Sequence, residues 1–293
     1  MTAPGPGPGP APATPTEGLL LVDKPAGVTS HDVVDVVRRT LGTRKVGHAG
    51  TLDPMATGLL VLGAGRATRL LRFLGDLAKT YEGTMRLGVE TTTLDATGEV
   101  AREGPVTATR DDVAEAMRAL EGESLQRPPA YSAVKVGGRK LYEAARAGEA
   151  LEAAPRSIRV DTFELRSFHP PEATFHVTCS GGTYVRVLAA DVGAALGCGA
   201  HLVALRRTAI GAFRVEDAAP PEAAAPRPIE TAVHHLPRLD LDAEEGRAAS
   251  HGRPLGPAGI AGPYGVFDPD GRLIGVYQDE GSRARPLVIL ASA

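Results

Sequence analysis

Two segments rich in Pro and Ala limit what this chain can fold into, because neither can contribute to a packed core. Residues 1–16 contain no charged or aromatic side chain, and residues 217–228 read DAAPPEAAAPRP. Segments of this composition bury too little apolar surface to offset the entropy lost on ordering. We therefore expect four parts in chain order: a disordered tail over 1–16, a body over 17–216, a linker over 217–235 and a small C-terminal domain over 236–293.

The body mixes strand and helix patterns. Strand-like apolar runs occur in four places, namely residues 19–22, 59–62, 80–87 and 156–179. Helix-like apolar spacing occurs in three, namely residues 30–41, 109–120 and 183–197. The mixture predicts an α+β fold in which helices flank a mixed, mostly antiparallel sheet.

Local signals sharpen some of these elements. Ser30 is expected to cap the first helix and Gly42 to end it. The buried face of that helix is predicted to carry Val33, Val36, Val37 and Leu41. In the C-terminal domain, GVFDPDGRLIGVY has two apolar runs around Asp-Pro-Asp-Gly, which predicts a hairpin in a β-rich unit.

Charge is distributed unevenly along the chain. The net charge is −3, yet residues 124–215 carry 12 Lys and Arg against 7 Asp and Glu, and the acidic excess lies in residues 91–123 and 216–293. An uneven distribution of this kind permits a nucleic-acid partner without requiring one. The chain contains two Cys and no apolar stretch of the roughly 20 residues that span a bilayer. We expect reduced thiols, a cytoplasmic location and no membrane partner.

Common cofactor and metal motifs are missing from the sequence. There is no Gly-Lys dipeptide for a phosphate-binding loop, and LGAGRAT lacks the third glycine of a dinucleotide fingerprint. No H-x-E, C-x-x-C or H-E-x-x-H pattern is present, which argues against zinc deaminases and zinc proteases. The sequence therefore predicts neither a cofactor nor a metal.

The segment VGHAGTLDPMATG, residues 46–58, is the clearest candidate for chemistry. Its glycines leave backbone positions free for close approach to a ligand, and Pro54 biases Asp53 away from helical geometry. Another interpretation is that Asp53 merely caps a helix beginning at Pro54. From the residues alone, both interpretations stay open.

Five blocks in order resemble the TruB-type tRNA pseudouridine-55 synthases: GLLLVDKPAGVTSHDVV, VGHAGTLDPMATGLLVLG, KTYEGTMRLG, RPPAYSAVKVGGRKLYEAAR and GTYVRVLAADVGAALGCGAHLVALRR. The resemblance covers roughly residues 17–215. It implies a cofactor-free isomerase that flips a T-loop uridine out of tRNA and converts it to pseudouridine. It also implies a PUA-like C-terminal domain.

The resemblance assigns roles to individual residues. Asp53 is implied to be the catalytic carboxylate, Arg186 its partner, and Tyr81 an aromatic that packs against the flipped base. Four further residues are implied to lie at the substrate: His48, which stacks where the uridine leaves the T loop, Tyr184, Leu205 and, by a looser match, Lys24.

Two other classes of function stay open. A non-catalytic RNA-binding or RNA-folding protein would share the phosphate contacts that the Arg-rich stretches of the body are expected to make, but would not need Asp53. A glycosidase-like hydrolase would need a second carboxylate, for which Asp95 and Asp191 are candidates. We expect a monomer without a protein partner. Because the C-terminal domain is short, acidic and free of Lys, its removal from Leu236 onward is expected to leave activity nearly intact.

Overall fold

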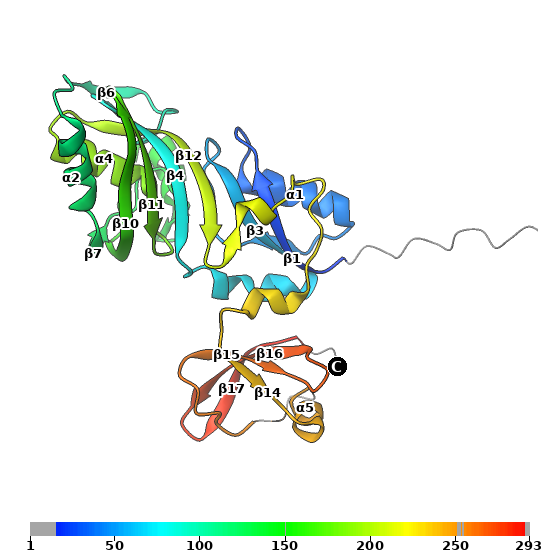
Figure 1. Cartoon of the computed structure of the whole chain (residues 1–293). Coiled ribbons are helices and arrows are strands. Elements are labelled where there is room, and N and C mark those ends of the chain that lie inside the picture. Colours follow the sequence, from blue (N-terminus) through cyan, green and yellow to red (C-terminus); the bar gives the residue numbers. More distant parts are fainter. Residues whose placement is uncertain (1–15, 150, 251–252, 254, 291–293) are drawn as a thin grey trace, which may run out of the picture.

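The computed structural model describes residues 16–149, 151–250, 253 and 255–290. It shows a large sheet with helices and, next to it, a smaller β-rich C-terminal part (Figure 1). The predicted disordered tail falls outside the described residues except for Thr16. No helix among the described residues is long and apolar enough to cross a membrane.

The chain forms short elements throughout. The first half of the body contains β1 (Gly18–Lys24), α1 (Ser30–Leu41), β2 (Val46–His48), β3 (Thr57–Ala64), the 3-10 helices η1 (Gly65–Arg69) and η2 (Leu71–Leu74), β4 (Lys79–Leu87), β5 (Val89–Thr91), β6 (Val100–Glu103) and α2 (Arg110–Arg118). The second half contains β7 (Gly122–Gln126), β8 (Lys135–Val136), β9 (Arg139–Lys140), α3 (Leu141–Arg146), β10 (Arg156–His169), β11 (Glu172–Cys179), α4 (Val185–Ala195), β12 (Ala200–Ile210), β13 (Phe213–Arg214), η3 (Val215–Asp217) and η4 (Ile229–Val233). The C-terminal part contains β14 (Arg238–Asp240), α5 (Ala243–Ser250), β15 (Pro263–Phe267), β16 (Leu273–Glu280) and β17 (Arg283–Ile289).

One large sheet organises the body. Its strands run in the order β1-β3-β12-β4-β11-β10-β7, with β2 added on β3 and β13 on β12. All pairs are antiparallel except a short parallel contact that places Arg206 and Arg207 opposite Thr57 and Gly58. The predicted α+β class with a mixed, mostly antiparallel sheet is confirmed.

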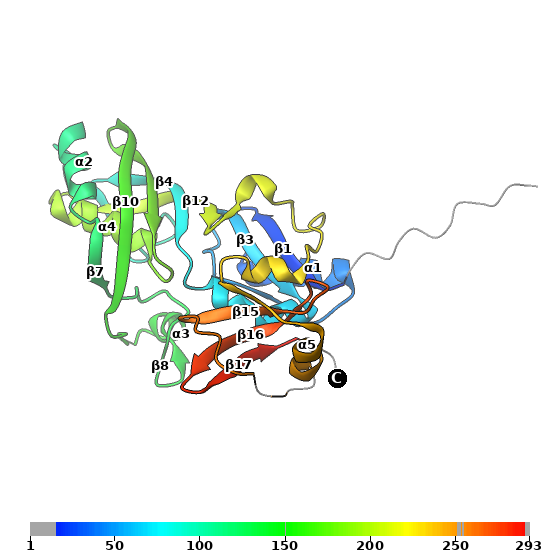
Figure 2. The same ribbon diagram turned by 60° about the horizontal axis from the view of Figure 1, so that its bottom comes forward.

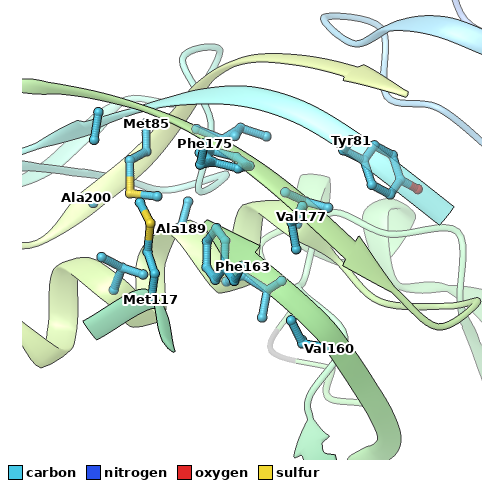
Figure 3. Packing of buried hydrophobic residues seen from close by; sticks show 14 of the residues in the cluster. Tyr81, Met85, Met117, Val160, Phe163, Phe175, Val177, Ala189 and Ala200 are labelled. Atoms are coloured by element: carbon cyan, nitrogen blue, oxygen red, sulfur yellow. The ribbon is translucent and has the colours of Figure 1, made fainter. Parts of the chain in front are cut away.

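The helices α2 and α4 pack on one face of this sheet and close the main core (Figure 1). In that core Phe163 and Phe175 meet edge to face, with ring centroids 5.3 Å apart. Tyr81 lies at the margin of the same cluster, and its hydroxyl points away from the packed phenylalanines (Figure 3). The core therefore supports the ring of Tyr81 and leaves its polar end outside.

The cap of α1 differs from the prediction. Thr29, not Ser30, is the N-cap: its side chain accepts from the Asp32 amide at 3.1 Å, and the Asp32 carboxylate accepts from the Thr29 amide at 2.8 Å. Ser30 is the first helical residue and is buried. The Thr-x-x-Asp spacing completes a capping box, which a cap at Ser30 could not do.

The buried face of α1 also differs at one position, since Val34 is buried with Val33, Val37 and Leu41, whereas Val36 is only half-buried. At about 100° per residue, Val34 lies beside Leu41 on the helix, and Val36 lies on the other side of Val33.

The segment predicted as a linker lies against the body. The amide of Leu19 donates to the carbonyl of Arg227 at 3.1 Å, and the amide of Arg227 donates back at 2.7 Å. In η4, Ala232 and Val233 are fully buried. Residues 217–235 thus continue the packing of β1, although the domain boundaries themselves stay predictions.

The C-terminal part shares a core with the body. Phe267, Leu273, Val276 and Val288 belong to the same buried cluster as body residues of β1, β3 and η2. Arg66 donates to the carbonyl of Leu290 at 2.9 Å. The predicted hairpin is present as β15 and β16 (Figure 2). Because removal from Leu236 onward would expose this shared core, we now expect truncation to destabilise the body.

Candidate active site

Asp53 lies on a tight turn between β2 and β3. The amide of Ala56 donates to the carbonyl of Asp53 at 3.0 Å, and no helix follows Pro54. The interpretation of Asp53 as a helix cap is therefore wrong. Its side chain keeps 37% of its accessible surface, so the carboxylate is reachable from outside the fold.

The turn is held on both sides by Gly27, before α1, and by Ser30, the first residue of α1. The Ser30 hydroxyl accepts from the amide of Leu52 at 2.9 Å and lies 3.1 Å from the carbonyl of Leu52. The amide of Gly27 donates to the carbonyl of Pro54 at 2.8 Å. The peptide groups before and after Asp53 are thus fixed by buried or part-buried hydrogen bonds, which limits the directions that its carboxylate can take.

Lys24 also stabilises the turn around Asp53. Its ammonium is fully buried and donates to the carbonyls of Pro25 at 2.9 Å, Val28 at 2.6 Å and Pro54 at 3.3 Å. Burial lowers the pKa of Lys24 to about 8, while the nearby charge of Asp53 opposes that change. The family resemblance implied that Lys24 lies at the substrate. In the structure its ammonium stabilises the turn that carries Asp53.

Arg186 joins Asp53 to a second carboxylate. Its Nη2 lies 3.6 Å from Oδ2 of Asp53, and its Nη1 lies 3.4 Å from Oδ2 of Asp95. Nη2 also donates to the carbonyl of Tyr131 at 2.6 Å. Arg186 comes from the first turn of α4 and is 5% exposed, and its Nε has no hydrogen-bond partner among the described residues. Both terminal nitrogens thus contact oxygen atoms of the protein, whereas Nε has no acceptor among the described residues.

The charge balance around Asp53 is set by these neighbours. Burial raises the pKa of Asp53, the guanidinium of Arg186 lowers it, and the negative charge of Asp95 raises it. Two carboxylates thus share one guanidinium. Lys24 adds a further positive charge that favours the ionised form.

Asp95, the second carboxylate on Arg186, is held by hydrogen bonds of its own loop. Its Oδ1 accepts from the hydroxyl of Thr93 at 2.7 Å and from the amide and hydroxyl of Thr97 at 3.0 and 2.6 Å. The sequence suggested Asp95 only as the second acid of a hydrolase. The threonines on both sides of it, in the segment TTTLDAT, could have indicated from the sequence that this carboxylate is held by hydrogen bonds within a loop. Asp191, the other candidate, is exposed on α4.

Tyr81 and Leu205 come from neighbouring strands, β4 and β12. Tyr81 is buried, and Leu205 is half-buried and packs against the same core cluster. Burial raises the pKa of Tyr81, the guanidinium of Arg207 opposes this, and the charge of Asp53 is close enough to raise it slightly further. Tyr81 therefore belongs to the electrostatic surroundings of Asp53.

Tyr184 is the residue before α4. The guanidinium carbons of Arg156 and Arg186 lie 4.6 and 5.8 Å from the centre of its ring. Its backbone is gripped by Gln126, whose amide oxygen accepts from the Tyr184 amide at 2.7 Å and whose amide nitrogen donates to the Tyr184 carbonyl at 3.2 Å. Sequence reasoning missed Gln126, which is 4% exposed.

His48 lies at the end of β2 and is half-buried. Its Nδ1 is buried without a hydrogen-bond partner among the described residues. Burial, together with the charge of Arg207, lowers the pKa of His48, which favours the neutral ring.

No cluster of three or more His, Cys, Asp or Glu residues that could hold a metal ion occurs in the part of the chain that the structure describes. Cys179 and Cys198 are free and buried.

Comparison with known proteins shows similarity over most of the chain. Residues 38–185 match the family model "TruB family pseudouridylate synthase (N terminal domain)", residues 186–221 match "tRNA pseudouridylate synthase B C-terminal domain", and residues 236–291 match "tRNA Pseudouridine synthase II, C terminal". A tRNA pseudouridine synthase B of Mycobacterium sp. (strain KMS) is 47% identical over 287 residues, covering 94% of this chain and 97% of the relative. The enzyme of that name from Thermobifida fusca is also 47% identical, covering 94% and 99%.

Solved structures give the same picture of the fold. A chain from the crystal structure of a Cbf5-Nop10-Gar1 complex superposes with a TM-score of 0.74 at 27% identity, covering 94% of this chain and 85% of that one. A chain from an H/ACA RNP bound to a substrate RNA containing 2'-deoxyuridine gives a TM-score of 0.71 at 25% identity, with the same coverage.

Proposed function

The chain belongs to the TruB family of pseudouridylate synthases, and on that premise we propose that Asp53, Arg186 and Tyr81 perform its chemistry. It is a tRNA pseudouridine(55) synthase, an isomerase that converts the T-loop uridine of tRNA to pseudouridine. The reaction breaks the bond from ribose C1′ to uracil N1 and joins C1′ to C5. A proton leaves C5 and one is gained at N1, so no electrons are transferred overall.

The observation that carries the proposal is the placement of Asp53. Its carboxylate is partly exposed on a rigid turn and lies 3.6 Å from the buried guanidinium of Arg186. A carboxylate can attack C1′, add to C6 of uracil or remove a ribose proton, and each route needs it ionised. Burial would favour the neutral acid, and Arg186 counters that effect.

The other predicted residues support binding of an extruded base. Flipping a uridine out of a folded loop costs a few kcal/mol, about the cost of unstacking. We propose that the neutral ring of His48 takes the vacated position in the stack and that Tyr81 and Leu205 contact the flipped uracil. Tyr184, with Arg156 beside its ring, is proposed to contact the nucleotide backbone. Lys24 keeps the Asp53 turn in place.

Release of tritium from a T-arm stem-loop labelled at uridine C5, without added cofactor, tests the assignment. We expect release by the protein and at least about 1000-fold slower release by Asp53→Asn, because no other group can replace the carboxylate. RNA binding by Asp53→Asn, measured by filter retention, should be kept within a few fold. Equal release by both proteins would contradict the role of Asp53.

The alternatives predict different outcomes. A non-catalytic RNA-binding protein would release no tritium and would tolerate Asp53→Asn. A hydrolase would liberate free uracil, but its candidate second acids are poorly suited: Asp95 is buried against Arg186, and Asp191 is exposed on α4.

We also propose that the protein acts as a monomer in the cytoplasm, because one chain supplies every residue of the proposed site and the substrate is tRNA. Light scattering of the protein with and without the stem-loop tests the monomer.

A further inference from the structure

Arg207 is the largest side chain that the fold buries completely, and its charge is not balanced by an ion pair. It is 1% exposed, and no ion pair among the described residues includes it. Burying an unpaired cation is unfavourable unless hydrogen bonds and a task at the site compensate for it. Its neighbour Arg206 is an ordinary contrast: it is partly exposed and forms an ion pair with Asp23 at 2.8 Å.

The hydrogen bonds of Arg207 reach both ends of the Asp53 loop. Its Nε donates to the carbonyl of Leu59 at 2.7 Å, and its Nη2 donates to the carbonyl of Gly50 at 3.1 Å. Its own backbone lies so close to Gly58 that a Cβ there would meet the Arg207 carbonyl at 2.3 Å. The guanidinium is therefore fixed in position relative to the loop that presents Asp53.

The same guanidinium faces Tyr81. Arg207 on β12 and Tyr81 on β4 are directly opposite in the antiparallel register, and both side chains are buried on the same face. Directly opposite residues have their Cβ atoms about 5 Å apart. The positive charge of Arg207 counteracts the effect of burial on the pKa of Tyr81.

We propose that Arg207 is a positioning residue that acts through Tyr81, holding the phenolic oxygen in place against the flipped base and stabilising negative charge on it while the C5 proton leaves. The inference rests on the proposed function, since it assumes that Tyr81 faces the uracil. The phenolic oxygen passes its own O–H proton to solvent and takes the C5 proton in its place, and N1 gains a proton from solvent, so the protons balance and the step needs no co-reactant. Arg207 itself does not touch the substrate.

A double-mutant cycle tests the inference. Tritium release is measured in single turnover, with enzyme in excess over the labelled stem-loop, for the parent, Arg207→Lys, Tyr81→Phe and the double variant. Lysine keeps the charge, but its single nitrogen cannot span the carbonyls of Leu59 and Gly50, which Nε and Nη2 of Arg207 reach separately. We expect Arg207→Lys to slow release about 30-fold in the parent and less than about threefold when Phe replaces Tyr81, because coupled residues are not additive. RNA affinity should change little in either background.

Arg206→Lys is the matched control, with the same change on the adjacent residue of β12. It can keep its ion pair with Asp23, and we expect its release rate within about twofold of the parent. An equal fold loss from Arg207→Lys in both backgrounds would overturn the proposal, because Arg207 would then act on the loop alone. Arg207→Gln supplies the same cycle if the Lys variant does not fold, and failure of both to fold would assign Arg207 to stability and also overturn it. The unsubstituted protein tests the proposed function separately, because the absence of tritium release from it would contradict that function.

Discussion

Two segments reach Arg186 from different sides, and they are held in different ways. The loop of residues 46–58 is fixed by buried groups, namely Lys24, Ser30 and Arg207. The insertion of residues 127–155 has a small buried core around Leu141 and Ala144, and exposed ion pairs join Arg127 with Glu152 and Arg139 with Glu149, whose side chains all keep more than half of their surface. Buried hydrogen bonds are costly to lose, whereas exposed ion pairs contribute about 0–1 kcal/mol. We therefore expect the loop to be held more firmly than the insertion.

Hydrogen bonds from two residues, Gln126 and Tyr131, connect the insertion and the strand before it to the site. Gln126, at the end of β7, grips the backbone of Tyr184, and the carbonyl of Tyr131 accepts from Arg186. The insertion also carries the exposed cations Arg127, Lys135, Arg139 and Arg146. A nucleic acid that bound these cations would act on Tyr184 through Gln126 and on Arg186 through Tyr131.

The largest effect is expected from loosening the loop. Lys24→Met removes the donor to three carbonyls and should lower the free energy of unfolding by about 3 kcal/mol and the rate of tritium release at least about 50-fold. Urea unfolding and single-turnover release measure the two quantities. Lys79→Met is the control: Lys79 is also buried and its side chain lies beside Gly50, but it donates to the carbonyls of Gly75 and Leu77 and not to those of the Asp53 turn. It should lose similar stability but keep its rate within a few fold.

Changing the pH sharpens the same comparison. Because the pKa of Lys24 is lowered to about 8, its ammonium loses a proton above that pH, and the neutral amine has only two N–H groups for three carbonyls. The rate of release should therefore fall as the pH rises through about 8. The pKa of Lys79 is lowered to the same value, so Lys79→Met should keep this decline while Lys24→Met loses it. A decline that disappears in Lys79→Met would contradict the assignment to Lys24.

A smaller effect is expected at the contact between β7 and α4. Gln126→Met keeps the length of the side chain but removes the acceptor of the Tyr184 amide, while the Tyr184 carbonyl still accepts from the amides of Val187 and Leu188. We expect the rate to fall about tenfold because the first turn of α4, with Arg186, is less well fixed, while RNA affinity falls less than about threefold. Arg127→Gln, at the next residue and exposed, serves as control. A loss of affinity equal to the loss of rate would mean that Gln126 serves binding rather than positioning.

The smallest effect is expected on the insertion itself. Glu149→Gln breaks the exposed pair with Arg139 and should change the free energy of unfolding by less than about 0.5 kcal/mol. It frees Arg139 for phosphate, so affinity for the stem-loop should rise slightly, most at low salt. Filter retention across a salt series measures this. A stability loss above about 1.5 kcal/mol would show that the insertion is held as firmly as the loop, and the comparison would fail.

Part of this protein could be derived from its sequence. The glycines and proline of residues 46–58 predicted an irregular loop around Asp53, and apolar periodicity predicted the strands, the helices and the α+β class. Resemblance to a family then selected Asp53, Arg186 and Tyr81 from many equally plausible residues. The fold class and the family were confirmed because they depend on local backbone preferences and on whole motifs, whereas the roles of Asp53, Arg186 and Tyr81 stay proposals.

The tertiary structure alone decided which groups act on those residues. Arg186 meets Asp95 across 91 positions, and Arg207 meets Gly50 across 157. Strand alternation could not tell that Arg207 points inward and Arg206 outward, because β12 has irregularities between Leu202 and Ala204 and between Arg207 and Ala209 that shift its register. Each such bulge exchanges the two faces of a strand. The positions of buried charges are therefore fixed by pairing between distant strands, which the linear sequence does not contain.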